Sequence, residues 1–380
     1  MKLMEHTFLA ITEAGVEDEL AKEISGRFQV EVETDINKVY FKSDLSAVYE
    51  GNLSLRCMNR LILLLERSRF KNLDELYPIV KRVDYGWLIE PKRTFRIEVR
   101  RRGTHPFTSL EAASKIGQAV IDGYASSTGR KLKVDLESPD VEFWALIKDD
   151  EVQFGVNTTG GSLHKRGYRI YQHPASIRTT LACGLIYLSE WRSSEPFLDP
   201  MCGGGTIPIE AALMARKVPL DAFGREFAFF NLKFFDEGEY GKVKAKLKGE
   251  ASDGPFPIYG IDISRKYIAG ARENAKSAGV RDTVEFILGD GLNLNVLNFE
   301  PRFIVVNPPY GVRLSCPSLK EFYFKMINSV KKASSKATIV AVTTATNEFK
   351  AAARRAGAQL VEERRTFHGE MPGSILKLRI

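Results

Sequence analysis

The chain has 380 residues, of which 44% are hydrophobic and 27% charged, a composition that fits two or three globular domains. No apolar run approaches the ~18 residues that a membrane span needs, and the first residues do not indicate an export signal. The four cysteines contain no C-x-x-C pair, so neither a disulfide framework nor a zinc site or other metal site is expected.

The net charge of +7 is distributed unevenly along the chain. Residues 1–50 carry a net −6 and residues 51–380 a net +13. A basic body of this kind favours a polyanionic partner such as a nucleic acid, although lysines and arginines that only face water give the same count. The scattered cysteines fit a reducing compartment, so we expect a cytoplasmic protein.

Hydrophobic periodicity divides the first half of the chain into two units and a linker. Residues 1–55 predict a small α+β unit, in which a helix that ends at Gly26 lies between short strands. Residues 56–165 predict a second α+β unit. Its expected helices lie at 73–83 and 109–126, and its expected strands at 94–103, 133–150 and 151–159. Residues 166–175 end a Gly-rich, basic stretch and are interpreted as a linker.

Strands and helices alternate from residue 176 to residue 380. The predicted strands are 196–199, 257–264, 284–290, 302–307, 337–344, 359–367 and 374–380, and the predicted helices are 206–217, 265–279, 319–334 and 347–357. Such alternation is typical of an α/β fold, a mostly parallel sheet with helices on both faces. In such a sheet ligands bind at the carboxyl ends of the strands.

A glycine-rich turn follows the first of these strands, in the sequence LDPMCGGGTIPIEAAL of residues 198–213. Its three glycines permit positive φ and a close approach of the backbone to a ligand, and Thr206 is expected to cap the next helix. The turn is neither G-x-G-x-x-G nor G-K-[ST], so it does not predict a phosphate site. Asp199, directly before it, suits a cationic or hydroxylated ligand.

Two further carboxylates end the next two predicted strands. Asp262 in YGIDIS can accept both hydroxyls of a ribose, and Asp290 in LGDG can accept from an exocyclic amine. Each aspartate alone is more often a turn residue. Together with Asp199 and the glycine turn they predict a nucleoside site without a phosphate.

The stretch IVVNPPYGVRL, residues 304–314, follows the fourth strand with an amide, two prolines and an aromatic. The prolines restrict their neighbours, so the Asn307 side-chain oxygen and the Pro308 carbonyl can both face one point. Two acceptors on a planar NH₂ group favour its pyramidal, nucleophilic form, and Tyr310 offers a π face to hold the planar group. The alternative is a rigid turn that only ends the strand.

Together these residues resemble the class I S-adenosylmethionine-dependent methyltransferases, specifically the amino-methyltransferases with an [N/D]-P-P-[Y/F] loop after the fourth strand. The resemblance implies that Asn307, Pro308 and Tyr310 hold the target amine, and that Asp262 binds the ribose and Asp290 the adenine amine of the cofactor. The remaining residues that the resemblance implies for cofactor binding are Asp199, Cys202, Gly203, Gly205, Thr206, Gly291 and again Asn307. Amine methylation needs no nucleophilic thiol, so Cys202 is interpreted as a pocket residue.

Residues 95–169 resemble a THUMP domain, an RNA-binding module, most specifically in RRRG and VDLESPDVEF. Residues 1–55 then correspond to the ferredoxin-like unit that precedes it. The basic residues expected to contact RNA phosphates are Arg100, Arg101, Arg102, Lys165, Arg166 and Arg169.

The whole chain resembles the THUMP-containing tRNA guanosine N2-methyltransferases of archaea and their bacterial relatives. This resemblance implies a seven-stranded Rossmann-like domain over 176–380 and a tRNA substrate modified at position 6 of the acceptor stem. No obligate protein partner is evident from the sequence, so we expect a monomer. The resemblance also accounts for residues 225–244 as an insertion of this group. The open alternatives are methylation of a ribosomal RNA guanine or of adenine N6, methylation of a protein glutamine, and a non-catalytic RNA-binding protein.

Overall fold

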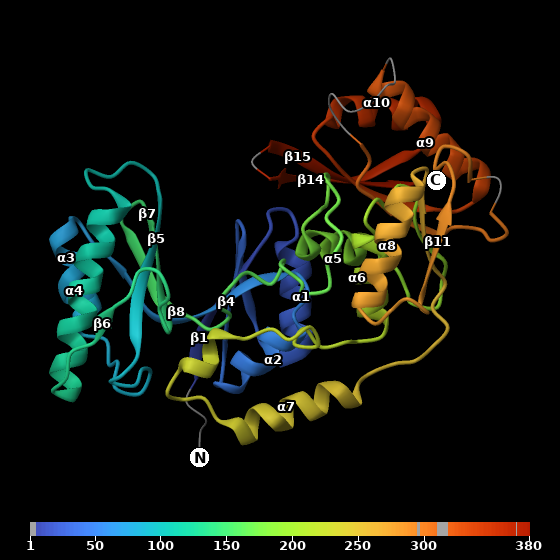
Figure 1. Ribbon diagram of the computed structural model, residues 1–380. Helices are drawn as coiled ribbons and strands as arrows, with labels where there is room; N and C mark the ends of the chain where they lie inside the picture. The colour runs from blue at the N-terminus through green and yellow to red at the C-terminus, as the bar shows by residue number, and fades with distance from the viewer. Residues whose placement is uncertain (1–4, 295–296, 310–317, 370) are drawn as a thin grey trace.

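The computed structural model describes residues 5–294, 297–309, 318–369 and 371–380, and its strands form two sheets. Figure 1 shows three parts in a row: a THUMP-like part around β5 and β7, a central part around β1 and α1, and a C-terminal part that carries β10 to β15. This arrangement agrees with the expected α/β domain preceded by two α+β units.

The first sheet joins both N-terminal units. Its strands are β1 (His6–Thr12), β2 (Val32–Asp35), β3 (Lys38–Ser43), β4 (Met58–Arg69), β5 (Thr94–Arg102), β6 (Lys133–Val134), β7 (Val141–Lys148) and β8 (Glu151–Asn157). They run in the order β2-β3-β1-β4-β8-β7-β5-β6. β4 pairs with β1 of the first unit and with β8 of the second, so the two units share one sheet. The strand expected over 133–150 is two strands, β6 and β7, separated by a loop.

Four helices cover this sheet: α1 (Glu17–Phe28), α2 (Ser46–Ser54), α3 (Leu73–Lys81) and α4 (Ser109–Thr128). Helix α1 continues two residues beyond Gly26, where it was expected to end. The sequence analysis predicted neither α2 nor β4. The LILLL run of β4 is apolar on both faces because the strand lies in the middle of the sheet, so it lacks the alternation that marks a half-exposed strand.

The second sheet has the order β11-β10-β9-β12-β13-β15-β14. Its strands are β9 (Phe197–Asp199), β10 (Ile258–Asp262), β11 (Val284–Leu288), β12 (Phe303–Val306), β13 (Thr338–Thr343), β14 (Gln359–His368) and β15 (Met371–Arg379). Strands β9 to β13 are parallel, and β15 and β14 form an antiparallel hairpin at one edge. The chain runs from β9 outward to β11 and then returns to β12, so the strand order reverses between β9 and β12.

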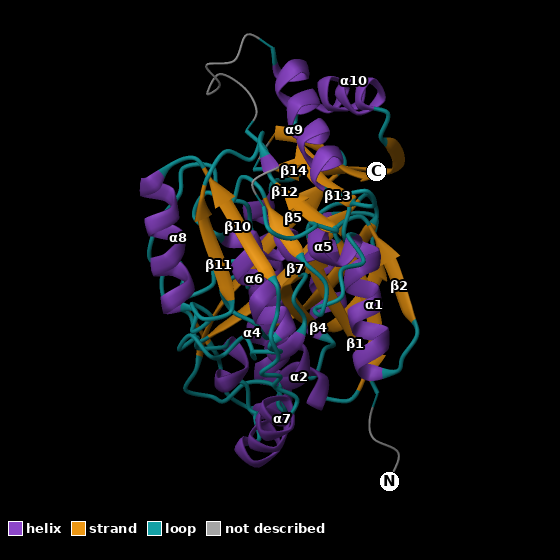
Figure 2. Cartoon of the chain, turned by 90° about the vertical axis from the view of Figure 1, so that its right-hand side faces the viewer, coloured by secondary structure: helices purple, strands orange, loops and turns teal. Residues whose placement is uncertain are grey.

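Helices lie on both faces of this sheet (Figure 2). They are α5 (Thr179–Leu188), α6 (Thr206–Ala215), α8 (Arg265–Ser277), α9 (Leu319–Ala333) and α10 (Thr346–Ala356). One apolar cluster contains α5, α6 and α8, and another contains α9 and α10. In the part of the chain described, no helix is long and apolar enough to span a bilayer.

The insertion between α6 and β10 holds the two halves together. It contains a 3₁₀ turn (Ala228–Asn231) and helix α7 (Glu237–Gly249), which runs below the central part in Figure 1. Phe229 is fully buried against Tyr49 of α2, with ring centroids 5.3 Å apart, and its amide donates to the Thr158 carbonyl. The Asn231 side chain donates to the Asp140 carbonyl in the THUMP-like part. The insertion therefore packs on the N-terminal sheet rather than on its own domain alone.

A buried ion pair also joins the same parts. Arg166 lies 3.4 Å from the Glu210 carboxylate of α6, and both side chains are inaccessible to water. Arg166 also donates to the carbonyl of Arg56 in the N-terminal unit, and Glu210 accepts from the Tyr168 hydroxyl and the Cys183 thiol. Burial lowers the pKa of Arg166, but the Glu210 carboxylate, together with Cys183 and Tyr168, more than offsets this effect, so the pKa is raised. Removal of either side chain would therefore leave the other charge buried without a partner, which would destabilise the fold.

We expect Glu210→Ala to lower the free energy of unfolding by about 3–5 kcal/mol, because it leaves the Arg166 charge buried without a partner. Urea denaturation followed by circular dichroism measures this loss. The control is Glu239→Ala, which breaks the exposed Lys242–Glu239 pair and should change stability by less than about 1 kcal/mol. Equal effects of the two variants would contradict a structural role for the buried pair.

Candidate active site

Four predicted site residues meet at one edge of the second sheet. Asp199 and Asp262 end β9 and β10, Asp290 follows β11 by two residues, and Asn307 follows β12 directly. The four strands are neighbours in the order β11-β10-β9-β12, and all point the same way. Their carboxyl ends therefore bring these side chains to the point where the strand order reverses, the usual ligand position in such folds.

The glycine turn crosses this edge between β9 and α6. Gly203 and Gly205 have φ of +51° and +80°, which L side chains rarely adopt. The Gly203 amide donates to the Asp262 carboxylate at 2.9 Å, so the turn is held against β10. Thr206 was expected to cap α6. It is instead the first helical residue, and Gly205 occupies the cap position because only the left-handed backbone of that residue turns the chain into the helix.

Gly291 is required by close packing. A Cβ atom at Gly291 would lie 2.2 Å from the Pro200 carbonyl oxygen. The loop after β11 therefore touches the loop after β9, which brings Asp290 toward the other carboxylates. Asp290 is exposed and accepts from the Leu292 amide with one oxygen.

Asp199 and Cys202 lie in the most buried part of the site. Asp199 is 2% exposed and accepts from the Met201 amide, and burial, helped by the Asp262 carboxylate, raises its pKa well above the usual value. Burial and the two carboxylates also raise the pKa of the Cys202 thiol. A thiol in this setting stays protonated and is a poor nucleophile. The buried Asp199 carboxylate has no cationic partner among the residues described, which suits a positively charged ligand group.

The linker forms part of the site. The Tyr171 amide donates to the Asn274 side chain, which in turn donates to the carbonyls of Tyr171 and Gly204. The His173 ring lies beside Gly203 and Gly204 and stacks edge-on against Tyr267 at 4.4 Å. The sequence analysis missed these residues. The aromatic-rich stretch YRIYQHP was the available signal, because a mobile linker has no need for buried aromatic side chains.

The linker also orients Asn307. Its Nδ2 atom donates to the Ala175 carbonyl at 3.1 Å. A carbonyl can only accept, so the Oδ1 atom must face the other way. This oxygen is buried and has no hydrogen-bond partner among the residues that the structure describes. Such an acceptor is costly unless a ligand donates to it.

The two prolines that follow Asn307 are held by the protein core and by helix α9. Pro308 is buried, and the Pro309 carbonyl accepts from the Tyr323 hydroxyl of α9 at 3.3 Å. That hydroxyl also bonds to Thr343 at the end of β13. Tyr310 lies outside the described residues.

Two exposed aliphatic side chains mark one wall of the site. Ile263 follows Asp262 directly and is 75% exposed, and Leu288 ends β11 and is 45% exposed. Large apolar residues that stay exposed next to a polar cluster commonly line a ligand site. Neither was singled out from the sequence.

The structure separates the expected RNA-contacting residues into two sets. Arg100, Arg102 and Lys165 are exposed, whereas Arg101 lies over the Phe107 ring and donates to Ser109. Arg166 and Arg169 do not fit the expectation. Arg166 is paired with Glu210 inside the protein. Arg169 donates to the backbone carbonyls of His164 and Ile177. Both guanidinium groups thus hold the linker to the protein on either side of it instead of facing solvent.

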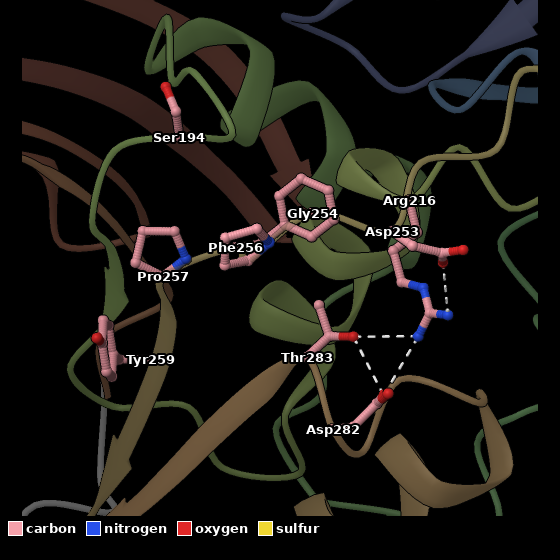
Figure 3. A pocket seen from close by; sticks show the side chains of 10 residues that line it. Ser194, Arg216, Asp253, Gly254, Phe256, Pro257, Tyr259, Asp282 and Thr283 are labelled. Atoms are coloured by element: carbon pink, nitrogen blue, oxygen red, sulfur yellow. Dashed lines mark hydrogen bonds and ion pairs between the residues drawn. The ribbon is translucent and has the colours of Figure 1, made fainter.

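A separate hollow of about 550 Å³ lies at the opposite, amino-terminal edge of the same sheet (Figure 3). Pro257 and Thr283, which line it, directly precede β10 and β11. Its Arg216 is paired with Asp253 and Asp282, so its charges are already neutralised. No group of three or more His, Cys, Asp or Glu side chains in the described ranges is placed to hold a metal ion.

The reversed strand order, the glycine turn and the carboxylates define the site of a class I methyltransferase. The comparisons agree. Residues 166–372 match the RMKL-like methyltransferase domain, residues 70–157 the THUMP domain and residues 7–62 the RlmL ferredoxin-like domain.

Two curated relatives are named tRNA (guanine(6)-N2)-methyltransferase. The one from Methanocaldococcus jannaschii is 37% identical over 92% of this chain and 93% of its own length, and the one from Archaeoglobus fulgidus is 35% identical over 98% and 92%. The crystal structure of a methylase from Clostridium difficile 630 is 29% identical and superposes with a TM-score of 0.87 over 99% of this chain and 98% of its own. The chain therefore belongs to the RMKL-like family of S-adenosylmethionine-dependent methyltransferases, in the form that carries a ferredoxin-like and a THUMP domain.

We expect Asp199→Asn to stabilise the ligand-free protein by about 1–3 kcal/mol at pH values above the folded-state pKa of Asp199, because it removes a buried charge there. The folded-state pKa of Asp199 is raised, so the gain should be full above that pKa and vanish as the pH falls toward the ordinary aspartate value. The same variant should bind S-adenosylmethionine about ten-fold or more weakly. Thermal melts at several pH values and calorimetric titration measure the two effects. The exposed Asp282→Asn should change neither.

We expect Tyr323→Phe to lower kcat about ten-fold while the Kd for S-adenosylmethionine stays unchanged, because the Pro309 carbonyl loses its donor. Steady-state kinetics and calorimetry separate the two. Tyr124→Phe is the matched control, since it removes a similar bond from a buried tyrosine to the Ile89 carbonyl far from the site. A weaker cofactor affinity with unchanged kcat would show that Tyr323 acts elsewhere.

Proposed function

We propose that the protein transfers a methyl group from S-adenosylmethionine to the exocyclic N2 amine of a guanosine in tRNA, at position 6 of the acceptor stem. The family, the two relatives named for this reaction and the basic body of the chain support the substrate. The single observation that carries the chemistry is the unpaired, buried Oδ1 atom of Asn307.

The residues at the strand ends fit the cofactor. Asp199 would face its positively charged methionine part, the Asp262 carboxylate its ribose, and Asp290 its adenine amine. Gly203, Gly205 and Gly291 would allow the backbone to approach, while Cys202, Thr206 and Ile263 would line the pocket. When bound, S-adenosylmethionine supplies an electrophilic methyl group.

Asn307 would activate the amine that attacks this methyl group. The N2 lone pair of guanine is delocalised into the ring, so the planar amine is a weak nucleophile. Asn307 Oδ1 and the Pro308 carbonyl would accept its two hydrogens and favour the pyramidal form, in which the lone pair is free. Tyr310 would hold the base. No general base is needed before transfer, because the methylated amine becomes acidic and loses its proton to water.

The target guanosine would have to leave the stem before it reaches Asn307, because N2 of a paired base is not accessible to the site. The THUMP domain would hold the tRNA at a distance set by the insertion and the Arg166–Glu210 pair. Arg100, Arg102 and Lys165 are the exposed cations that we assign to its phosphates. The protein would act as a cytoplasmic monomer.

The test uses purified protein, labelled S-adenosylmethionine and unmodified tRNA transcripts, followed by mass spectrometry of the nucleosides. N2-methylguanosine is the expected product, and fragment mapping then locates it. N6-methyladenosine as the product would agree with the amine chemistry proposed for Asn307 but would show that the target base is adenine instead of guanine. Transfer to ribosomal RNA or to a protein glutamine, with none to tRNA, would overturn the substrate.

We expect Asn307→Ala to lower kcat by about 10²–10³-fold, because it removes an acceptor aimed at the reacting amine. The Kd for tRNA, measured by filter binding, should stay within about two-fold, because phosphate contacts carry most of that affinity. Asn347→Ala, at an exposed position of α10, is the control and should behave like the wild type. Near-normal rates for Asn307→Ala would exclude this mechanism.

A further inference from the structure

The β14–β15 hairpin carries a groove that the proposed chemistry does not use. The groove has a volume of about 660 Å³ and lies between the tip of the hairpin and the N-terminal unit. Figure 1 shows the hairpin reaching from the second sheet over the central part. Arg364 of the hairpin donates to Asp18 and to the Gly15 carbonyl, so the two walls are in contact. The lining residues that matter here are Ile36, Thr346, Arg365, Thr366, Phe367 and Pro372.

The groove lies on the same edge of the sheet as the loop of Asn307, Pro308 and Pro309, which we call the reaction loop. Ser374 of β15, which lines it, pairs with Thr343 at the carboxyl end of β13. Thr343 bonds to the Tyr323 hydroxyl, and Tyr323 in turn donates to Pro309. The groove and the Pro309 end of this loop are therefore connected through Thr343 and Tyr323.

Several apolar side chains in and beside the groove are unusually exposed, although Glu17, Thr346 and Ser374 also line it. Phe367 is 52% exposed and forms a cross-strand pair with Pro372, while Ile36 on the facing turn is 63% exposed. Met371, at the tip, is 50% exposed. Exposed apolar side chains that gather at one place mark a binding surface. An aromatic ring beside a proline is suited to a flat partner.

The polar groups of the groove suit a nucleotide. Arg365 is exposed and has no ion-pair partner among the residues that the structure describes. It lies two positions from Phe367 on the same strand, so both side chains share one face. Thr366 lies between them, so its side chain points to the opposite face of the strand, where it is buried.

We propose that this groove binds one unstacked nucleotide of the RNA substrate, with the base against Phe367 and Pro372 and the phosphate at Arg365. The proposal rests on the proposed function, since it takes the substrate to be RNA. Aromatic stacking accepts any base, which suits a contact that positions the strand rather than reads its sequence. The groove thus holds the substrate beside the nucleotide that enters the reaction loop.

Steady-state kinetics with tRNA provides the first test. Phe367→Ala should raise KM for tRNA about ten-fold, and Phe367→Trp should restore it, because stacking on the ring is lost and regained. Arg365→Ala should raise KM and flatten its salt dependence. The Kd for S-adenosylmethionine should not change in any of these variants. Leu360→Ala is the matched control, since Leu360 is a 39% exposed apolar residue at the other end of β14.

Tryptophan fluorescence provides a local readout of the same contact. In Phe367→Trp, tRNA should quench the emission more than in the wild type, whose three tryptophans give the background. Unchanged KM in Phe367→Ala and no added quenching would overturn the groove while leaving tRNA methylation intact. The proposal would also be overturned if a free mononucleotide quenched the emission as strongly as tRNA does. It would likewise be overturned if sedimentation showed that the wild type is a dimer and that Phe367→Ala dissociates it. Loss of the proposed function appears separately, as a wild-type protein that does not methylate tRNA.

Discussion

The buried Arg166–Glu210 ion pair is the interaction on which the arrangement of the molecule depends. Glu210 lies on α6, the helix that begins at the glycine turn, and Arg166 begins the linker and bonds to the N-terminal unit. A charge pair inaccessible to water cannot be rearranged at low cost, because either partner alone would be left buried. The pair therefore fixes the start of the linker relative to the cofactor turn, and the insertion around Phe229 also fixes the N-terminal sheet.

The position of the linker then determines the geometry of the reaction loop. After Arg166 the linker passes along the glycine turn, where Tyr171 and His173 lie. The Ala175 carbonyl at its end then accepts a hydrogen bond from the Asn307 side chain. That single hydrogen bond turns the Asn307 oxygen toward the space where an amine can donate. A segment that connects two domains thus orients the Asn307 amide, which couples the placement of the N-terminal half to the site proposed for the chemistry.

The site combines groups that are unfavourable without a ligand. Asp199 carries a raised pKa because it is buried beside Asp262, and the oxygen of Asn307 is buried without a donor. Stability is given up at these positions so that the ligand finds acceptors already in place, which is the usual relation between preorganised sites and fold stability.

The sequence by itself determined the order of the strands and of helices α6, α8, α9 and α10 in the C-terminal half, though not helices α5 and α7, and the strand-end positions of Asp199, Asp262, Asp290 and Asn307. These follow from local periodicity and from the rule that parallel strands end at one edge. Only the tertiary structure decided that β4 joins two units into one sheet, that Arg166 and Arg169 face inward, and that Ala175 orients Asn307. Each of these depends on contacts between residues far apart in the chain, and a lone arginine or a continuous apolar run has the same local pattern whichever neighbour it meets.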